Sequence, residues 1–131
     1  MSSEKNYSLA KLKKAFLKLK ESTENAVDEL DRDGVIQRFE FTFELFWKAT
    51  KIILEEEGFE CAGQKSCIKE GARRGFLAEG EMLLDMLEDR NKTSHIYDES
   101  TAKEIFERIK GIYVALIEKN ITAFENYLSK A

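Results

Sequence analysis

The fold class of this chain is indicated most clearly by residues 33–59, DGVIQRFEFTFELFWKATKIILEEEGF. Its apolar side chains recur every three or four positions, which places them on one face of an α-helix. That face comprises Ile36, Phe39, Phe43, Phe46, Thr50 and Ile53. Phe41, Leu45 and Ile52 form a second apolar face. Because both faces have to be covered, we expect this helix to lie at the centre of a bundle, or to meet another subunit with its second face.

Helical periodicity extends through three further segments, residues 7–30, 78–91 and 101–128. In the first segment, Leu9, Leu12, Phe16 and Leu19 share one stripe, and lysines fill the opposite side. A basic amphipathic helix can also lie on a membrane or contact RNA. Acidic residues follow on the same predicted helix, however, and these are Glu21, Glu24, Asp28 and Glu29. A core helix with a solvated lysine face is therefore the favoured interpretation.

Glycines and polar residues set the expected helix ends. Gly58 ends the central helix, and a short helix starts near Ser66. Thr101 and Glu104 have the spacing of a capping box at the start of the last helix. The sequence thus predicts an all-α fold in one domain, residues 1–131. We expect an antiparallel four- to five-helix up-and-down bundle that dimerises.

Composition restricts the partners and the cellular compartment. The chain has 131 residues and a net charge of −4, so any contact with RNA or nucleotide has to be local or shared with a partner. The longest uncharged apolar run within a predicted helix, residues 111–117, is far below the roughly 20 residues of a membrane span. The N-terminus lacks the apolar segment of a signal peptide. We therefore expect a cytoplasmic protein in which Cys61 and Cys67 are free thiols.

The segment DRNKTSHIYDE, residues 89–99, contains the only histidine of the chain. A lone histidine near a helix end is often a surface residue. Arg90 and His95 nevertheless fit a metal-independent chemistry on RNA. The imidazole would take the proton of a ribose 2′-hydroxyl, and the guanidinium would stabilise charge on the phosphate. No cofactor is expected.

Arg90 and His95 are separated by about 500° of rotation on a regular helix, so they would not share a face if the helix continued. Two arrangements would bring them together. In one, the helix ends near Asn91. In the other, a two-fold axis passes through the motif and brings both side chains from each of two protomers into one cleft.

RNKTSHIYDE resembles the R-N-x-x-x-H-x-Y signature of the HEPN superfamily. The chain is similar to its nucleotidyltransferase substrate-binding protein family, which includes relatives of the HepT-like toxins. RFEFTFELFWK at residues 38–48 and the run at residues 69–99 extend the resemblance over nearly the whole chain. The resemblance implies a dimerising helical bundle with a small nucleotidyltransferase as partner. Lys92 and Cys67 depart from the pattern, which has an apolar residue and a proline at these positions.

The resemblance also assigns residue roles. It implies that Arg90 stabilises phosphate, that His95 transfers a proton and that Asn91 is a polar residue shaping the pocket. Tyr97 matches the tyrosine that the partner nucleotidyltransferase modifies with AMP in toxin–antitoxin relatives. The alternative for Tyr97 is a ring packed on the bundle with a solvated hydroxyl.

Two functions follow from these roles. The favoured one is a substrate-binding subunit that binds nucleotide or RNA phosphate for a nucleotidyltransferase. The alternative is a metal-independent ribonuclease toxin, silenced at Tyr97. The chain has no nucleotidyltransferase signature of its own, and a purely structural dimer is disfavoured.

Overall fold

The computed structural model describes residues 3–95 and 98–130, and every regular element among them is a helix. This confirms the all-α prediction. In chain order the elements are α1 (Ser3–Asn25), α2 (Glu29–Glu56), α3 (Gln64–Arg73), α4 (Gly80–Lys92), the 3-10 helix η1 (Thr93–His95), α5 (Glu99–Arg108), the π-helix η2 (Ile109–Tyr113) and α6 (Val114–Ser129).

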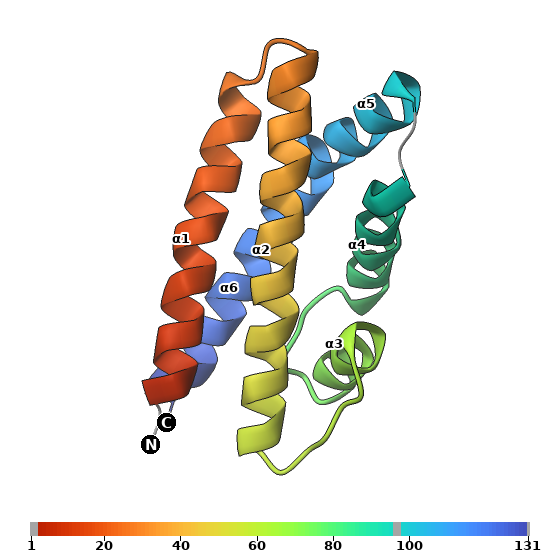
Figure 1. The fold of residues 1–131 in the computed structure, drawn as a ribbon. Helices are drawn as coiled ribbons and strands as arrows, with labels where there is room; N and C mark the ends of the chain where they lie inside the picture. Colours follow the sequence, from red (N-terminus) through yellow and green to blue (C-terminus); the bar gives the residue numbers. More distant parts are fainter. Residues whose placement is uncertain (1–2, 96–97, 131) are drawn as a thin grey trace.

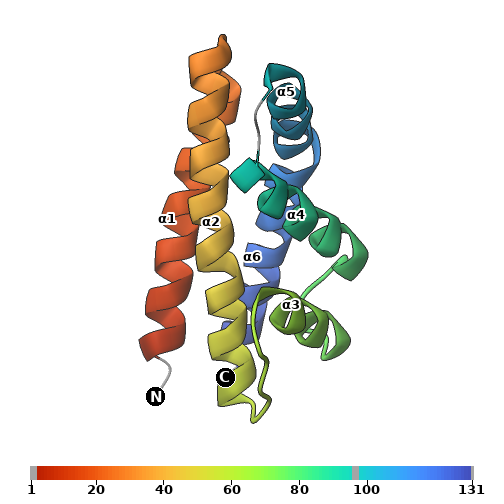
Figure 2. The same cartoon turned by 45° about the vertical axis from the view of Figure 1, so that its right-hand side comes forward.

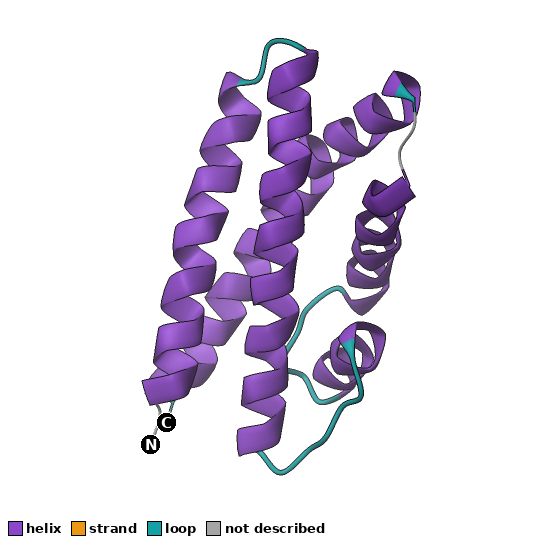
Figure 3. Ribbon diagram, in the orientation of Figure 1, coloured by secondary structure: helices purple, strands orange, loops and turns teal. Residues whose placement is uncertain are grey.

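The long helices form an antiparallel bundle. Helices α1 and α2 make a hairpin, α6 lies against α1, and α4 and α5 lie on the other side of α2 (Figure 1). Helices α5, η2 and α6 follow one another without a loop and act as one long helix (Figure 3). The short α3 packs across the lower part of the bundle against α2 and α4. The described ends of the chain therefore lie close together at one end of the bundle.

Only one of the two apolar faces of α2 is fully buried by the rest of the described chain. The face predicted to be buried is indeed buried, and the Phe39 ring stacks on Tyr113 with centroids 5.7 Å apart. On the second face, Leu45 and Ile52 are half-buried, whereas the Phe41 side chain is 60% exposed. The described part of this chain therefore leaves the Phe41 end of the second face open to solvent.

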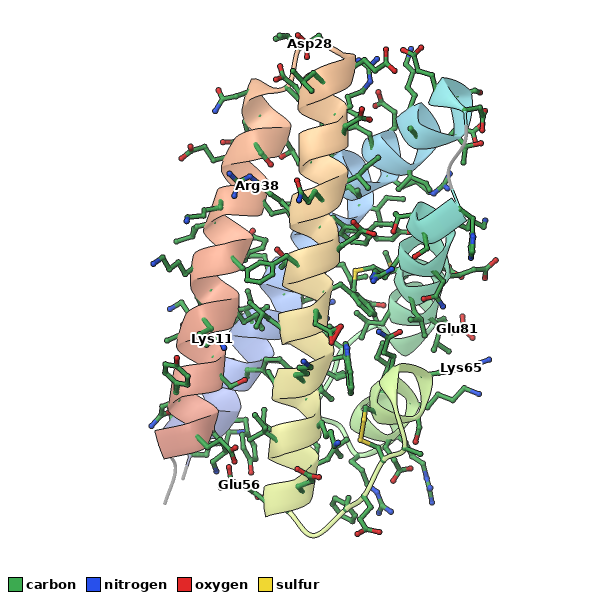
Figure 4. All side chains as sticks on the ribbon, viewed as in Figure 1. Lys11, Asp28, Arg38, Glu56, Lys65 and Glu81 are labelled. Atoms are coloured by element: carbon green, nitrogen blue, oxygen red, sulfur yellow. A yellow bond between two sulfur atoms is a disulfide. The ribbon has the colours of Figure 1, made fainter. Side chains whose placement is uncertain are left out.

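Two predicted helix boundaries are wrong, both for the same reason. Helix α1 ends at Asn25, so Asp28 and Glu29 do not belong to it; Asp28 lies in the turn before α2 (Figure 4) and its carboxylate accepts the amide of Asp31 at 2.8 Å. Likewise Asp98, not Thr101, caps α5, because its carboxylate accepts the Thr101 amide at 3.2 Å. An aspartate in extended backbone satisfies an unpaired helix amide and fixes the start of the helix.

The prediction of free thiols is also wrong, because Cys61 and Cys67 form a disulfide (yellow in Figure 4). The loop after α2 turns back at Gly63, where φ is +150°, a conformation that glycine adopts without steric cost. The two Cα atoms thereby approach to 4.9 Å, within the range that a disulfide spans. The bond joins the loop to the first turns of α3.

Candidate functional site

The motif lies where α4 ends and tightens into η1, beside the middle of α2 (Figure 2). Arg90 and Asn91 belong to the last turns of α4, and His95 is the last residue of η1. Tyr97 lies outside the described residues. Helix α4 ends at Lys92, one residue after Asn91, so the expected termination near Asn91 is confirmed.

Arg90 points toward α2. Its side chain is 22% exposed, and Nη1 lies 3.8 Å from Glu40 Oε2 and 3.4 Å from Ser94 Oγ. Its Nε is buried and has no hydrogen-bond partner among the described residues. These contacts are long, so the guanidinium is held in place while much of its capacity to donate hydrogen bonds stays unused.

Two carboxylates of α2, those of Glu40 and Glu44, interact with the charge of the Arg90 head group. The Thr93 hydroxyl lies 2.6 Å from Glu40 Oε2 and also 2.6 Å from the Arg90 carbonyl oxygen, so its single proton is shared between two acceptors. Burial raises the pKa of Glu44, but the hydrogen bond from Trp47 and the charges of Lys48 and Arg90 outweigh it and leave that pKa below its usual value. Glu44 is therefore a charged carboxylate on which the charge of Arg90 acts.

Asn91 and His95 do not join Arg90 in this chain. Both are exposed, and no hydrogen bond or ion pair connects the Arg90 and His95 side chains in the described part of the chain. Asn91 instead lines an open hollow of about 550 Å³ with Leu87 and the segment leading into α3. The three predicted site residues are neighbours along the chain whose side chains face different surroundings.

A second polar cluster adjoins the motif, and sequence reasoning missed it. Asp89 is only 4% exposed. Its Oδ2 and Oδ1 accept Arg108 Nε at 2.6 Å and Nη2 at 2.9 Å, and the Tyr113 hydroxyl donates to Oδ2 at 2.5 Å. Arg108 and Tyr113 lie five positions apart and share a face because η2 is a π-helix, in which each turn takes one more residue. Periodicity of the α-helical kind gives no signal for this pairing.

The pKa shifts of this cluster follow from burial and pairing. Burial alone raises the pKa of Asp89, but its hydrogen bonds from Arg108 and Tyr113 lower it further than burial raises it. The hydrogen bond to Asp89 raises the pKa of Arg108. Burial and the same carboxylate raise the pKa of Tyr113. Asp89 is therefore a charged structural residue, not a solvated acid that would repel RNA.

A groove of about 450 Å³ opens beside this cluster, between α4 and α5–η2. Asp85, Glu88 and Glu104 line it together with Lys92 and Arg108. Among the described residues, no group of three or more His, Cys, Asp or Glu side chains is arranged to hold a metal ion. None of the described helices has the length and apolarity needed to cross a membrane.

Fold and motif together define a class: small all-helical bundles that present an arginine, an asparagine and a histidine where one helix ends. The chain belongs to the family described as nucleotidyltransferase substrate binding protein like, whose sequence model matches residues 7–126. The family expected from the resemblance is confirmed.

Two further proteins are similar to this chain. A crystal structure of a protein from Thermus thermophilus superposes with a TM-score of 0.79 at 38% identity, covering 86% of this chain and 98% of that one. A protein of Haemophilus influenzae, named probable ribonuclease HepT, is 31% identical over 81 residues. That match spans 58% of this chain and 56% of the relative, just over half of its length.

Proposed function

We propose that this protein is the helical partner of a small nucleotidyltransferase and that it binds a nucleotide or RNA phosphate through Arg90, with Asn91 and His95 nearby. One observation carries the proposal: among the described residues, the polar contacts of the Arg90 guanidinium at the end of α4 are long, at 3.4 and 3.8 Å. The Nη groups that remain unpaired suit a phosphate, because the planar fork of arginine matches phosphate oxygens. The family description, which refers to a nucleotidyltransferase, supports the choice of partner.

The site is complete only in a homodimer in this proposal. Within one protomer Arg90 faces α2 and His95 is exposed at the end of η1. A two-fold axis along η1 would place the His95 imidazole of one copy near the Arg90 of the other. The exposed ring of Phe41 supports this arrangement, because it lies on the helix that carries Glu40 and offers apolar surface to a second protomer.

The alternative function is a metal-independent ribonuclease toxin, inactivated by AMP transfer to Tyr97. The relative named probable ribonuclease HepT favours it. The His95 side chain is exposed to solvent, and an imidazole in this position can accept a proton and return it. An AMP group on Tyr97 would add negative charge two residues from His95 and repel an RNA backbone.

Binding and cleavage are separated by one set of variants. Purified protein is titrated with radiolabelled RNA in EDTA, beside Arg90→Ala, His95→Ala and the control Arg73→Ala. Arg73 is an exposed cation on α3 that pairs with Glu70, so its loss matches the charge change at a distance from the motif. The proposal expects Arg90→Ala to lose binding and Arg73→Ala to keep it.

The outcomes are distinct. RNA binding without cleavage supports the substrate-binding subunit, and cleavage lost in both motif variants supports the ribonuclease. Equal binding by Arg90→Ala and Arg73→Ala contradicts both functions. The partner is tested by co-purification with a small nucleotidyltransferase of the same organism. Tyr97 is tested by mass spectrometry after incubation of both proteins with ATP, where AMP on another residue would refute its role.

A further inference from the structure

Glu40 is the residue through which α2 contacts the motif. Its side chain is 32% exposed, and Oε2 contacts two motif residues that lie far along the chain, in α4 and η1. One is Arg90, whose Nη1 is 3.8 Å away, and the other is Thr93, whose hydroxyl is 2.6 Å away. One carboxylate oxygen thus contacts both the end of α4 and the beginning of η1.

We infer that Glu40 is a positioning residue: its carboxylate fixes the orientation of the Arg90 guanidinium and the start of η1, so that Arg90 is arranged for phosphate before phosphate arrives. The inference rests on the proposed phosphate-binding function of Arg90. Glu40 itself contacts no ligand in this role. It acts through Arg90 and Thr93.

The chain contains a second arginine–carboxylate pair for comparison. It shows the difference between an arginine that is only oriented by a carboxylate and one whose N–H donors are already occupied by it. Arg108 is bound by both oxygens of the buried Asp89, at 2.6 and 2.9 Å, so its Nε and Nη2 are already engaged. The contact between Glu40 and Arg90 is longer by about 1 Å and involves one nitrogen only. A pair of this kind restricts the head group by charge attraction while leaving its N–H groups for another acceptor.

Restricting the rotamers of Arg90 before phosphate binds makes that binding more favourable. A free arginine side chain has considerable rotamer entropy, and part of it is lost when a ligand fixes the side chain. A neighbouring carboxylate that limits the rotamers beforehand reduces this cost. The buried Nε, which has no partner in the described part of the chain, is consistent with a head group held by its surroundings.

Glu40 also affects where His95 is presented. The Thr93 hydroxyl shares its proton between Glu40 and the Arg90 carbonyl oxygen, which ties the first residue of η1 to α2 and to α4 at once. His95 follows two residues later in the same 3-10 turn. The Glu40 carboxylate therefore helps to position the backbone that carries Arg90 and His95.

A purely electrostatic role for Glu40 predicts the opposite result. A negative charge near a phosphate site weakens anion binding, so its removal would strengthen binding. Positioning predicts that its removal weakens binding, because Arg90 is then free to rotate. Glu44 provides the matched control, because it lies one turn further along α2 and its negative charge also acts on Arg90. Its hydrogen-bond and ion-pair partners are Trp47 and Lys48, so its replacement removes a nearby charge without removing a contact to the motif.

The test uses the full-length protein and inorganic phosphate as the probe. The side-chain Nε–Hε NMR signal of Arg90, assigned by its loss in Arg90→Lys, reports the order of the guanidinium through its heteronuclear NOE. Phosphate titration of the same signal reports affinity. Wild type is compared with Glu40→Gln, Glu40→Ala and Glu44→Gln, and thermal unfolding confirms that each variant folds.

The expected result is a lower NOE and about threefold to tenfold weaker phosphate binding in Glu40→Ala. The loss should be smaller in Glu40→Gln, whose amide oxygen still accepts the Thr93 hydroxyl. Glu44→Gln should bind phosphate as tightly as wild type or more tightly. An unchanged Arg90 NOE in both Glu40 variants, or tighter phosphate binding by them, overturns the inference. If phosphate leaves the wild-type Arg90 signal unmoved, the proposed function fails instead, and the NOE comparison still tests the positioning contact.

Discussion

Adjacent residues at the end of α4 have opposite roles. Asp89 is buried and bound by Arg108 and Tyr113, whereas Arg90 turns to the other side and keeps long contacts with α2. The first residue fixes the helix end against α5 and η2, and the second is presented from that fixed end. A side chain that donates to phosphate is most effective when the backbone carrying it does not move.

We predict that Asp89→Asn destabilises the fold by about 2–4 kcal/mol, because it removes one partner of a buried pair and leaves the charge of Arg108 without its counter-ion. Urea unfolding followed by circular dichroism measures the change. Asp85→Asn is the control, since Asp85 is exposed on the same helix and should alter stability by less than about 0.5 kcal/mol. Equal stability of the two variants would refute a structural role for Asp89.

The same cluster predicts a pH dependence. The pKa of Asp89 is lowered in the folded state, so its contribution to stability is present above its unfolded pKa of about 3.9 and is lost as the pH falls through the lower folded value. The stability difference between wild type and Asp89→Asn should be constant above about pH 5 and shrink below about pH 4. Urea unfolding at about pH 3, 4, 5 and 7 spans this range and measures it. A difference that grows as the pH falls would contradict the assignment.

At the scale of elements, α3 is held close to α2 by a residue without a side chain. A Cβ on Gly71 would lie 2.9 Å from Thr50 of α2 and 2.7 Å from Leu77. Helix α3 therefore approaches α2 at a distance that only glycine permits. The start of the same helix lines the hollow to which Asn91 belongs, so the position of α3 affects the shape of that hollow.

We predict that Gly71→Ala destabilises the protein by about 1–3 kcal/mol, because the added methyl group overpacks the contact between α3 and α2. Gly34→Ala is the control: Gly34 lies in α2 with no atom within 4 Å of an added Cβ. That change should stabilise the protein by about 0.5–1 kcal/mol, because alanine favours the helix. Differential scanning calorimetry compares the two, and a stabilising Gly71→Ala would show that α3 can shift at no cost.

At the scale of the whole molecule, one bundle keeps the two motif side chains apart. Helix α2 occupies the space in front of Arg90, and His95 is exposed at the end of η1. The open end of the second face of α2, at Phe41, lies on that same central helix. A second protomer is the simplest source of the missing half of the proposed site.

Mixing two inactive variants tests this arrangement. If each site takes Arg90 from one protomer and His95 from the other, Arg90→Ala and His95→Ala mixed in equal amounts, unfolded and refolded together should recover about a quarter of the wild-type sites. The recovered sites are counted by RNA binding or cleavage, whichever the wild type performs. Sedimentation equilibrium verifies that mixed dimers form. No recovery in a verified mixed dimer would place Arg90 and His95 of one site in the same protomer or in separate roles.

The helices and the chemistry available at the motif could be predicted from the sequence. The buried face of α2, the end of α2 at Gly58 and the family were all readable, because helical periodicity, end signals and motif spacing are local along the chain. Local signals also account for the errors, since Asp28 and Asp98 compete with neighbouring residues for the helix starts.

The partners of the motif residues depend on the tertiary structure. Glu40 lies 53 residues from Thr93, and Arg108 and Tyr113 lie 19 and 24 residues from Asp89. The disulfide likewise depends on a loop that turns back on α3. Such contacts join elements distant in sequence, and a π-helix changes the register that α-helical periodicity assumes, so no local pattern encodes them.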